Sequence, residues 1–191
     1  MPPQRTVLAE GKHLRLARIG TWEYCERRNI SGIVCLVAVT DRAELVLIEQ
    51  FRPPVDCRVI ELPAGLAGDI PGQETEELAA AARRELLEET GYEAGALERL
   101  TEGPTSPGFG SERITMFLAR NVRRVSEGGG DSSESIVVHH VPLKQVPDWL
   151  EEKQRAGIPC DPKIYAALYF AGEKRPARRT SRSAPRRRKP E

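Results

Sequence analysis

The sequence predicts an α/β protein in which helices pack on a mixed β-sheet. Stretches with strand character and stretches with helical character both occur, but they do not alternate in the regular β-α-β order of a parallel sheet. The clearest strand is the unbroken apolar run at residues 33–39, and the clearest helix is the Glu-, Ala-, Leu- and Arg-rich stretch at residues 75–90.

The expected strands follow from apolar and β-branched runs. Residues 33–39 form a continuous run, which is typical of a strand buried on both faces. Asp41-Arg42-Ala43 then precedes another such run, which predicts a hairpin, and residues 63–72 are a loop rich in Gly, Pro and Asp. In chain order, the predicted strands fall within residues 13–28, 33–39, 45–48, 58–62, 113–120 and 135–142.

Helices are expected at residues 75–90, 143–154 and 161–171. The first contains neither Pro nor Gly, and Gly91 follows it as a C-cap signal. Beyond about residue 174 the chain is rich in Arg, Ser and Pro without apolar periodicity, which predicts disorder. The expected units are an N-terminal strand region (1–30), a central domain (31–173) and a basic tail (174–191).

Length and composition are those of one globular domain with appendages. The chain has 191 residues, of which 39% are hydrophobic and 30% charged. No apolar run approaches the roughly 20 residues that span a bilayer, and the first residues lead into no apolar signal segment. The four cysteines are scattered without a CxxC pair, which argues against a zinc site or a disulfide framework. We therefore expect a cytoplasmic protein with reduced cysteines and no membrane partner.

Charge is distributed unevenly along the chain. Residues 174–191 hold nine Lys or Arg and one acid, a balance of +8. Because the whole chain carries +1, residues 1–173 carry −7. An acidic body suits metal binding better than unaided binding of an anionic substrate.

The helical segment at 75–90 places carboxylates on its apolar side. At 100° per residue, Glu89 falls inside the apolar stripe and Glu85 at its edge, and these two acids repel each other. Carboxylates that face the fold are costly unless they are neutralised, and Mg²⁺ takes one or two carboxylates together with substrate phosphates. Glu88 lies further round the helix, near Arg84, where it either serves the outer shell of the metal or pairs with that arginine. A solvated face of Glu–Arg pairs is the alternative.

The order of residues in this helix adds a family resemblance. Arg-Glu-Leu-Leu-Glu-Glu-Thr-Gly-Tyr at 84–92 resembles the second half of the Nudix signature at every fixed position, and Glu76 stands at the expected distance before it. The signature glycine corresponds to Gly65, which leaves an insertion of five residues within 66–75. The resemblance implies a Nudix fold, a mixed sheet sandwiched by helices. It also implies Mg²⁺ or Mn²⁺ held by Glu85, Glu89 and the carbonyl of Ala64.

Two further segments resemble the ADP-ribose pyrophosphatase branch of that family, and the resemblance covers about residues 8–171. One, at 21–27, is similar to a strand motif that supplies substrate contacts; the other, at 50–54, is similar to an arginine-proline turn. The implied substrate-binding residues are Trp22, which would stack on adenine, Glu23, Arg27 and the phosphate contact Arg52. Ordinary sheet packing for the tryptophan and a surface position for Arg52 are the alternatives.

The segment at 105–112 is expected to be a mobile loop over the site, because it is rich in Gly and Ser. Pro107 lies fifteen residues after Tyr92, a spacing associated with ADP-ribose hydrolases. Glu112, its only carboxylate, matches a loop glutamate that is the catalytic base in some members. The resemblance thus implies a catalytic group of Glu112, Glu88 and Arg84. A solvated loop acid is the alternative for Glu112.

These implications add up to an expected activity. The chain is expected to hydrolyse the pyrophosphate bond of ADP-ribose to AMP and ribose 5-phosphate with Mg²⁺. Another nucleoside diphosphate sugar, such as GDP-mannose, is the alternative substrate. An inactive Nudix ligand-binding module is a further alternative, although all the signature glutamates are present.

The resemblance also implies a homodimer in which Trp22 and Arg27 act on the site of the partner chain. The basic tail at 174–191 has no recognisable fold, so it would bind nucleic acid at most without sequence preference. A solubilising or anchoring tail is the alternative.

Overall fold

The computed structural model describes residues 4–130 and 135–172. The strands of this part are β1 (Arg5–Glu10), β2 (Leu14–Ile19), β3 (Trp22–Arg27), β4 (Gly32–Thr40), β5 (Glu44–Arg52), β6 (Cys57–Glu61), β7 (Ala64–Ala67), β8 (Tyr92–Glu93), β9 (Leu97–Pro104), β10 (Arg113–Arg124) and β11 (Val137–Pro142). The helices are α1 (Leu78–Thr90), α2 (Val146–Arg155) and α3 (Lys163–Gly172), with a short 3₁₀ turn η1 (Pro53–Val55).

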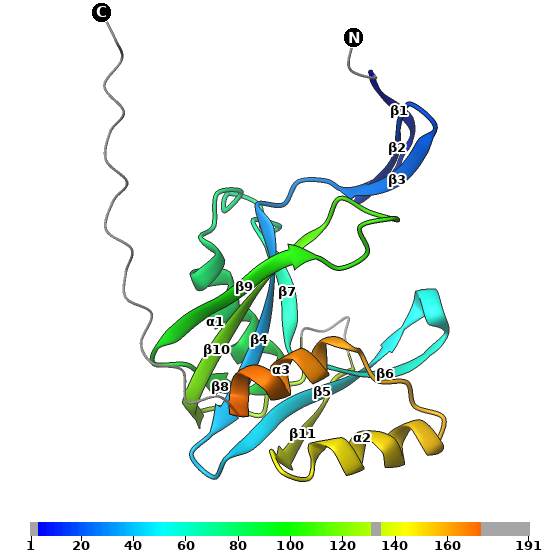
Figure 1. Cartoon of the computed structure of the whole chain (residues 1–191). Helices are drawn as coiled ribbons and strands as arrows, with labels where there is room; N and C mark the ends of the chain where they lie inside the picture. The colour runs from blue at the N-terminus through cyan, green and yellow to red at the C-terminus, as the bar shows by residue number, and fades with distance from the viewer. Residues whose placement is uncertain (1–3, 131–134, 173–191) are drawn as a thin grey trace, which may run out of the picture.

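The strands form two sheets. β1, β2 and β3 make an antiparallel three-stranded sheet that projects from the rest of the molecule (Figure 1). The main sheet has the order β11-β5-β4-β10-β8, with β6 beside β5, β7 beside β4 and β9 beside β10. β10 runs parallel to β4, whereas the other pairs are antiparallel. The predicted fold class, a mixed sheet with an N-terminal antiparallel strand region, is confirmed.

Helices cover both faces of the main sheet because the central strand is apolar on both sides (Figure 1). In β4, Val34, Leu36 and Ala38 pack in the cluster that includes the buried face of α1. The alternate residues Cys35, Val37 and Val39 pack in the cluster that includes α2 and α3. Residues 33–39 are all buried, as predicted for this run.

The differences from the sequence prediction concern elements stabilised by distant partners. β7 lies inside the expected loop at 63–72, because its residues 64–67 pair with residues 32–35 of β4. β1, β8 and β9 were not expected; β1 is exposed at every position and so has no apolar pattern. α1 begins at Leu78 rather than at residue 75, since Glu77 is the extended N-cap.

Two further predictions concern the C-terminal tail and membrane-spanning helices. The predicted disorder of residues 174–191 lies outside the described residues. Within the described part, none of the helices combines the length and the apolar character needed to cross a bilayer.

Candidate active site

Eight of the ten predicted site residues line one cavity of about 760 Å³. They come from β3, β5, β7, α1 and the segment just before β10. The eight are Arg27, Arg52, Ala64, Arg84, Glu85, Glu88, Glu89 and Glu112. The structure therefore gathers residues that lie up to 85 positions apart in the sequence.

Helix α1 presents its acids to this cavity because its apolar face is buried. Leu86 is fully buried against the sheet, and Glu89, three residues on, is only 3% exposed. The carboxylate of Glu89 accepts a hydrogen bond from the backbone N–H of Ala64 at 2.9 Å. Gly91 ends the helix in the left-handed region with φ 74°, which confirms the predicted C-cap.

Gly65 explains how Glu85 fits beneath β7. A Cβ atom at this position would lie 2.0 Å from the carboxyl carbon of Glu85, so only glycine leaves room for that carboxylate. Burial raises the pKa of Glu85 to about 7, although the neighbouring Arg84 guanidinium acts in the opposite direction. Burial thus disfavours the charged form of Glu85, and positive charge in addition to Arg84 would favour it.

Arg84 is the centre of an ion-pair network that holds this part of the cavity. Its guanidinium donates to both carboxylate oxygens of Glu76, at 3.1 and 3.0 Å, and to the carbonyl of Leu66 at 2.8 Å. It also donates to Glu85 at 2.8 Å and to Glu88 at 3.3 Å. Because these contacts use all three guanidinium nitrogens, Arg84 orients the carboxylates of α1 and ties them to the loop after β7.

The donor set suits a hard divalent cation. Glu85 and Glu89 supply two carboxylates, Ala64 lies against Glu89, and Gly65 leaves room that a side chain would fill. Within residues 4–130 and 135–172, no three His, Cys, Asp or Glu side chains form a closed metal-ligand cluster. A Mg²⁺ site typically takes one or two carboxylates, and water and substrate oxygens complete the coordination. The residues therefore fit the implied ion.

The opposite wall joins the projecting sheet to the segment that carries Glu112. Arg27 Nε lies 2.5 Å from Glu112 Oε1. The backbone of Cys25 donates to the Phe109 carbonyl at 2.8 Å and accepts from the Ser111 N–H at 3.1 Å. Two main-chain hydrogen bonds and one ion pair therefore attach the 105–112 segment to β3.

Arg52, the predicted phosphate contact, reaches the cavity from the end of β5. Its Nε donates to the carboxylate of Glu61 at 2.7 Å. Sequence reasoning missed Glu61, and it also missed Asp69, Asp161 and Lys163, which line the same cavity. Asp161 lies just before α3, and Lys163 is the first residue of that helix. In the sequence, an acid followed by proline at this point indicates only the start of a helix.

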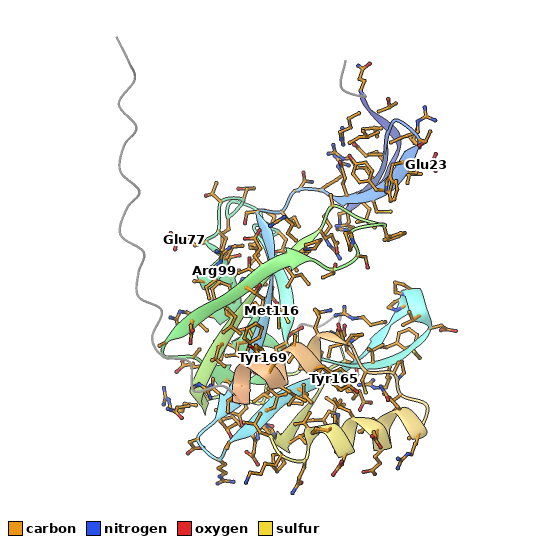
Figure 2. All side chains as sticks on the ribbon, in the orientation of Figure 1. Glu23, Glu77, Arg99, Met116, Tyr165 and Tyr169 are labelled. Carbon is orange, nitrogen blue, oxygen red and sulfur yellow. The ribbon has the colours of Figure 1, made fainter. Side chains whose placement is uncertain are left out.

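Trp22 and Glu23 are the two predicted residues that do not line the cavity. Both are exposed, Trp22 by 59%, and they lie at the β2–β3 turn, where Trp22 pairs with Ile19. Figure 2 shows Glu23 on the projecting sheet, away from the main sheet. Trp22 is five positions from Arg27, about 17 Å along the strand at roughly 3.3 Å per residue. Within one chain, the predicted base-stacking residue therefore lies outside the cavity that the signature carboxylates line.

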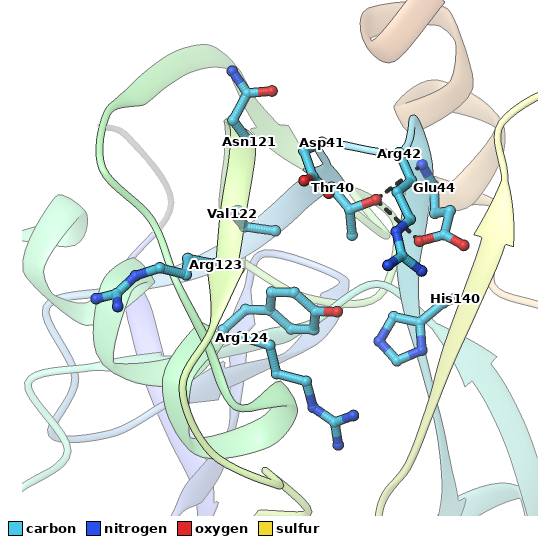
Figure 3. Close-up of a pocket in the computed structure, with 10 residues that line it drawn as sticks. Thr40, Asp41, Arg42, Glu44, Asn121, Val122, Arg123, Arg124 and His140 are labelled. Atoms are coloured by element: carbon cyan, nitrogen blue, oxygen red, sulfur yellow. Dashed lines mark hydrogen bonds between the residues drawn. The ribbon is translucent and has the colours of Figure 1, made fainter.

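A second hollow, of about 690 Å³, lies at the β4–β5 hairpin and contains no predicted site residue (Figure 3). Tyr92 and His140 form its aromatic wall, with ring centroids 5.6 Å apart. Its charged groups are Asp41, Arg42, Glu44, Arg123 and Arg124. The buried carboxylates of α1 line the first cavity and not this hollow.

Comparison with known proteins shows the family of this chain. A family model described as NUDIX domain matches residues 30–161, which include the whole of α1 and the loop before it. The chain belongs to the Nudix family. A solved structure, "Crystal structure of ADP compounds hydrolase", superposes with a TM-score of 0.66 over 89% of this chain and 92% of that chain. At 23% sequence identity, that match shows the fold alone.

Curated relatives of this Nudix protein carry two substrate names. The ADP-ribose pyrophosphatase of Bacillus subtilis is 36% identical over 64% of each chain. The GDP-mannose pyrophosphatase of Cronobacter sakazakii is 35% identical over 72% of this chain and 71% of its own. The methanol dehydrogenase activator of Bacillus methanolicus is 32% identical over 64% of each chain. This chain therefore spans about two thirds of the length of the relatives that it matches.

Proposed function

We propose that this protein hydrolyses the pyrophosphate bond of nucleoside diphosphate sugars, with ADP-ribose as the preferred substrate and Mg²⁺ or Mn²⁺ as the metal. The observation that carries the proposal is one cavity lined by the signature carboxylates, the loop acid Glu112 and the two arginines predicted to bind phosphate. A pyrophosphate resists attack because its oxygens repel a nucleophile, so the site must supply positive charge.

The assigned roles follow from position in the cavity. Glu85, Glu89 and the Ala64 carbonyl would hold the metal, which would supply positive charge against the phosphates and favour deprotonation of water. Arg27 and Arg52 bind the diphosphate, since a guanidinium can donate two hydrogen bonds to one phosphate.

Glu112 takes the proton as water attacks phosphorus, and the phosphorus–oxygen bond to the leaving phosphate breaks. Arg84 is a positioning residue in this scheme, because its donors are engaged by the carboxylates of α1 and the loop after β7. Glu88 supports the metal site from the exposed side of α1, where it pairs with Arg84.

GDP-mannose is the second candidate substrate. Relatives named for ADP-ribose and for GDP-mannose are almost equally identical to this chain, at 36% and 35%. The contacts with base and sugar that would distinguish ADP-ribose from GDP-mannose come from side chains outside the signature helix. The helix itself therefore favours neither substrate.

We also propose a homodimer that completes the site. The projecting sheet exposes large apolar side chains, and the 105–112 segment attached to it adds Phe109, which is 67% exposed. A patch of this kind marks an interaction surface. The partner chain would then bring Trp22 to the substrate base, whereas Arg27, also expected to act on the partner's site, lines the cavity of its own chain. The exposed apolar residues of β1–β3 are Val7, Leu8, Leu14, Ile19 and Trp22.

A turnover screen tests the proposed activity. Purified protein is incubated with Mg²⁺ and, separately, ADP-ribose, GDP-mannose, UDP-glucose and a diadenosine polyphosphate, and the products are separated by chromatography. We expect the highest kcat/KM with ADP-ribose and products AMP and ribose 5-phosphate. No hydrolysis of any nucleoside diphosphate sugar would reject the proposal, and preference for GDP-mannose would select the second candidate.

A further inference from the structure

Lys163, in the first turn of α3, is a cation of the cavity that the proposed mechanism has not used. It reaches the cavity from α3, which packs on the sheet face opposite α1, so it lines the cavity from a different element than the signature acids do. Its side chain is 31% exposed and forms an ion pair with Asp161, whose side chain is 12% exposed.

The segment before Lys163 is fixed firmly to the main sheet. The N–H of Ile60 donates to the Pro159 carbonyl at 2.9 Å, and the N–H of Asp161 donates to the Ile60 carbonyl at 2.8 Å. Asp161 also accepts the backbone N–H of Lys163 at 2.8 Å, which caps the helix. Asp161 therefore holds both the backbone and the ammonium group of Lys163, and a lysine that is normally flexible is oriented in advance.

Lys163 lines the same cavity as the signature acids and the Arg52–Glu61 pair. Ile60, whose main chain holds Asp161, directly precedes Glu61 in β6, so the start of α3 is fixed to the strand that carries Glu61. Lys163 and the Arg52–Glu61 pair therefore enter the cavity from neighbouring elements.

The charge of the cavity explains what such a cation can do. The described side chains that line it include seven acids and four bases, a formal balance of −3. All four bases are paired, but Arg84 uses all three guanidinium nitrogens on several partners, whereas Arg27, Arg52 and Lys163 each pair with one acid and keep further donors for a substrate. An ammonium group is a compact point charge that suits a phosphate oxygen.

We propose that Lys163 binds the diphosphate of the substrate from the α3 side, with Asp161 as the residue that positions it. This assignment rests on the proposed function of the same cavity. Arg27, Arg52 and Lys163 would contact the diphosphate from β3, β5 and α3, and the metal-binding acids of α1 would face it from the remaining side.

The test compares Lys163→Gln with Lys153→Gln. Lys153 is a matched control because it is also a partly exposed lysine, 24%, paired with the carboxylate of Glu49 at 3.4 Å, and it does not line the cavity. Calorimetric titration with ADP and with adenosine, in the presence of Mg²⁺, measures affinity with and without the diphosphate. Steady-state kinetics with the best sugar substrate separate KM from kcat.

We expect Lys163→Gln to weaken ADP binding and to raise KM about 10- to 100-fold, the range for one hydrogen bond to a charged group. The affinity for adenosine should not change. Lys163→Arg should recover most of the ADP affinity. Asp161→Asn should also weaken ADP binding, but by less than Lys163→Gln. Lys153→Gln should leave ADP affinity and KM at the wild-type values.

The outcomes separate the two proposals. If the wild-type chain hydrolyses a nucleoside diphosphate sugar but Lys163→Gln binds ADP as tightly as Lys153→Gln, the role of Lys163 is overturned and the activity stands. Equal losses for ADP and adenosine, accompanied by a lower Tm, would show that Lys163 is only structural and would also overturn it. If no sugar is hydrolysed while Lys163→Gln still weakens ADP binding alone, the activity is rejected and the diphosphate contact is supported.

Discussion

Arg27 on β3 and Glu112 before β10 form an ion pair of 2.5 Å across one wall of the cavity. One residue belongs to the projecting N-terminal sheet, and the other follows the segment that this sheet holds through Cys25. The proposed phosphate contact and the proposed base are therefore mutually positioned, and a change in either one alters the surroundings of the other.

Glu112→Gln tests the base. If Glu112 accepts the proton of the attacking water, kcat should fall by about 10²- to 10⁴-fold while KM changes little. Glu102→Gln is the control, since Glu102 also pairs with arginine but does not line the cavity. A mutant whose only defect is a raised KM would instead mean that Glu112 merely orients Arg27. In that case the double mutant with Arg27→Ala should be no worse than Arg27→Ala alone.

Glu89→Gln tests the metal ligand. The amide oxygen can still accept the Ala64 N–H, so the fold should persist, while the charge that attracts the metal is lost. We expect turnover to fall at least tenfold and the Mg²⁺ concentration for half-maximal rate to rise, measured by metal titration after treatment with a chelator. The same rate as wild type at saturating Mg²⁺ would reject this ligand assignment. Glu93→Gln, outside the cavity, serves as the control.

Gly65→Ala tests the space that Glu85 occupies. The added Cβ would displace a carboxylate, the end of a flexible side chain, so we expect a Tm within a few degrees of wild type and a large loss of kcat. Gly103→Ala, in strand β9, meets no atom within 4 Å and should leave kcat unchanged. A fully active Gly65→Ala protein would show that the position of Glu85 is not needed.

Trp22→Ala tests the proposed contribution of the partner chain. Because Trp22 is 59% exposed, its loss should leave the Tm nearly unchanged, and if it stacks on adenine it should weaken ADP-ribose binding by about 1–3 kcal/mol. The effect should be in KM, since the base lies far from the bond that breaks. Trp149→Ala is the contrasting variant; Trp149 packs on the core, so its loss should lower the Tm.

Mixing subunits then decides where Trp22 acts. A heterodimer of Trp22→Ala and Glu89→Gln chains contains one site with both wild-type residues if the site is shared between chains. We expect activity to recover towards half of the wild-type value per dimer after subunit exchange. Exchange without recovery would place Trp22 in its own chain's site or outside any site.

Acid stability should depend on Glu49, which is 8% exposed. Burial alone would raise the pKa of Glu49, but hydrogen bonds from Arg58 and His139 and the nearby Lys153 outweigh it and hold the pKa below its usual value. A lowered folded-state pKa gives stability that is present above the unfolded pKa and is lost as the pH falls through the folded pKa. The loss should therefore occur below about pH 4.5.

The corresponding measurement is Tm against pH from 7 to 3 for wild type and Glu49→Gln. We expect the variant to be less stable at pH 7 by about 1–3 kcal/mol, because charged hydrogen bonds are lost. The difference between the two proteins should shrink at low pH. A constant difference over the whole range would show that the charge of Glu49 does not contribute.

Periodicity and spacing predicted the parts of the site that depend on local chain geometry. Glu85 and Glu89 point inward because they share the side of α1 that Leu86 buries, and this could be read from helical geometry alone. Gly91 ends the helix as predicted for a glycine at this position, because glycine adopts a positive φ without strain.

The remaining features depend on contacts between distant segments. β7 was read as loop because its strand character comes from pairing with β4, and β9 likewise depends on β10. Asp161 and Lys163 carry no local signal beyond a helix start, and they become cavity residues only because the Pro159–Asp161 segment pairs with Ile60. The Arg27–Glu112 contact spans 85 residues, and no periodic pattern encodes it.

The attachment of the 105–112 segment to β3 also affects how the substrate range of such a protein can change. Its two hydrogen bonds involve only main-chain atoms, so they place no demand on the side chains of Cys25, Phe109 or Ser111. Residues along this segment can therefore be exchanged while the backbone path that leads to Glu112 is kept. A library randomised at Ser106 and Ser111 would vary side chains on the path to Glu112 without changing the main-chain contacts that position this acid, which makes this segment a practical starting point for directed evolution.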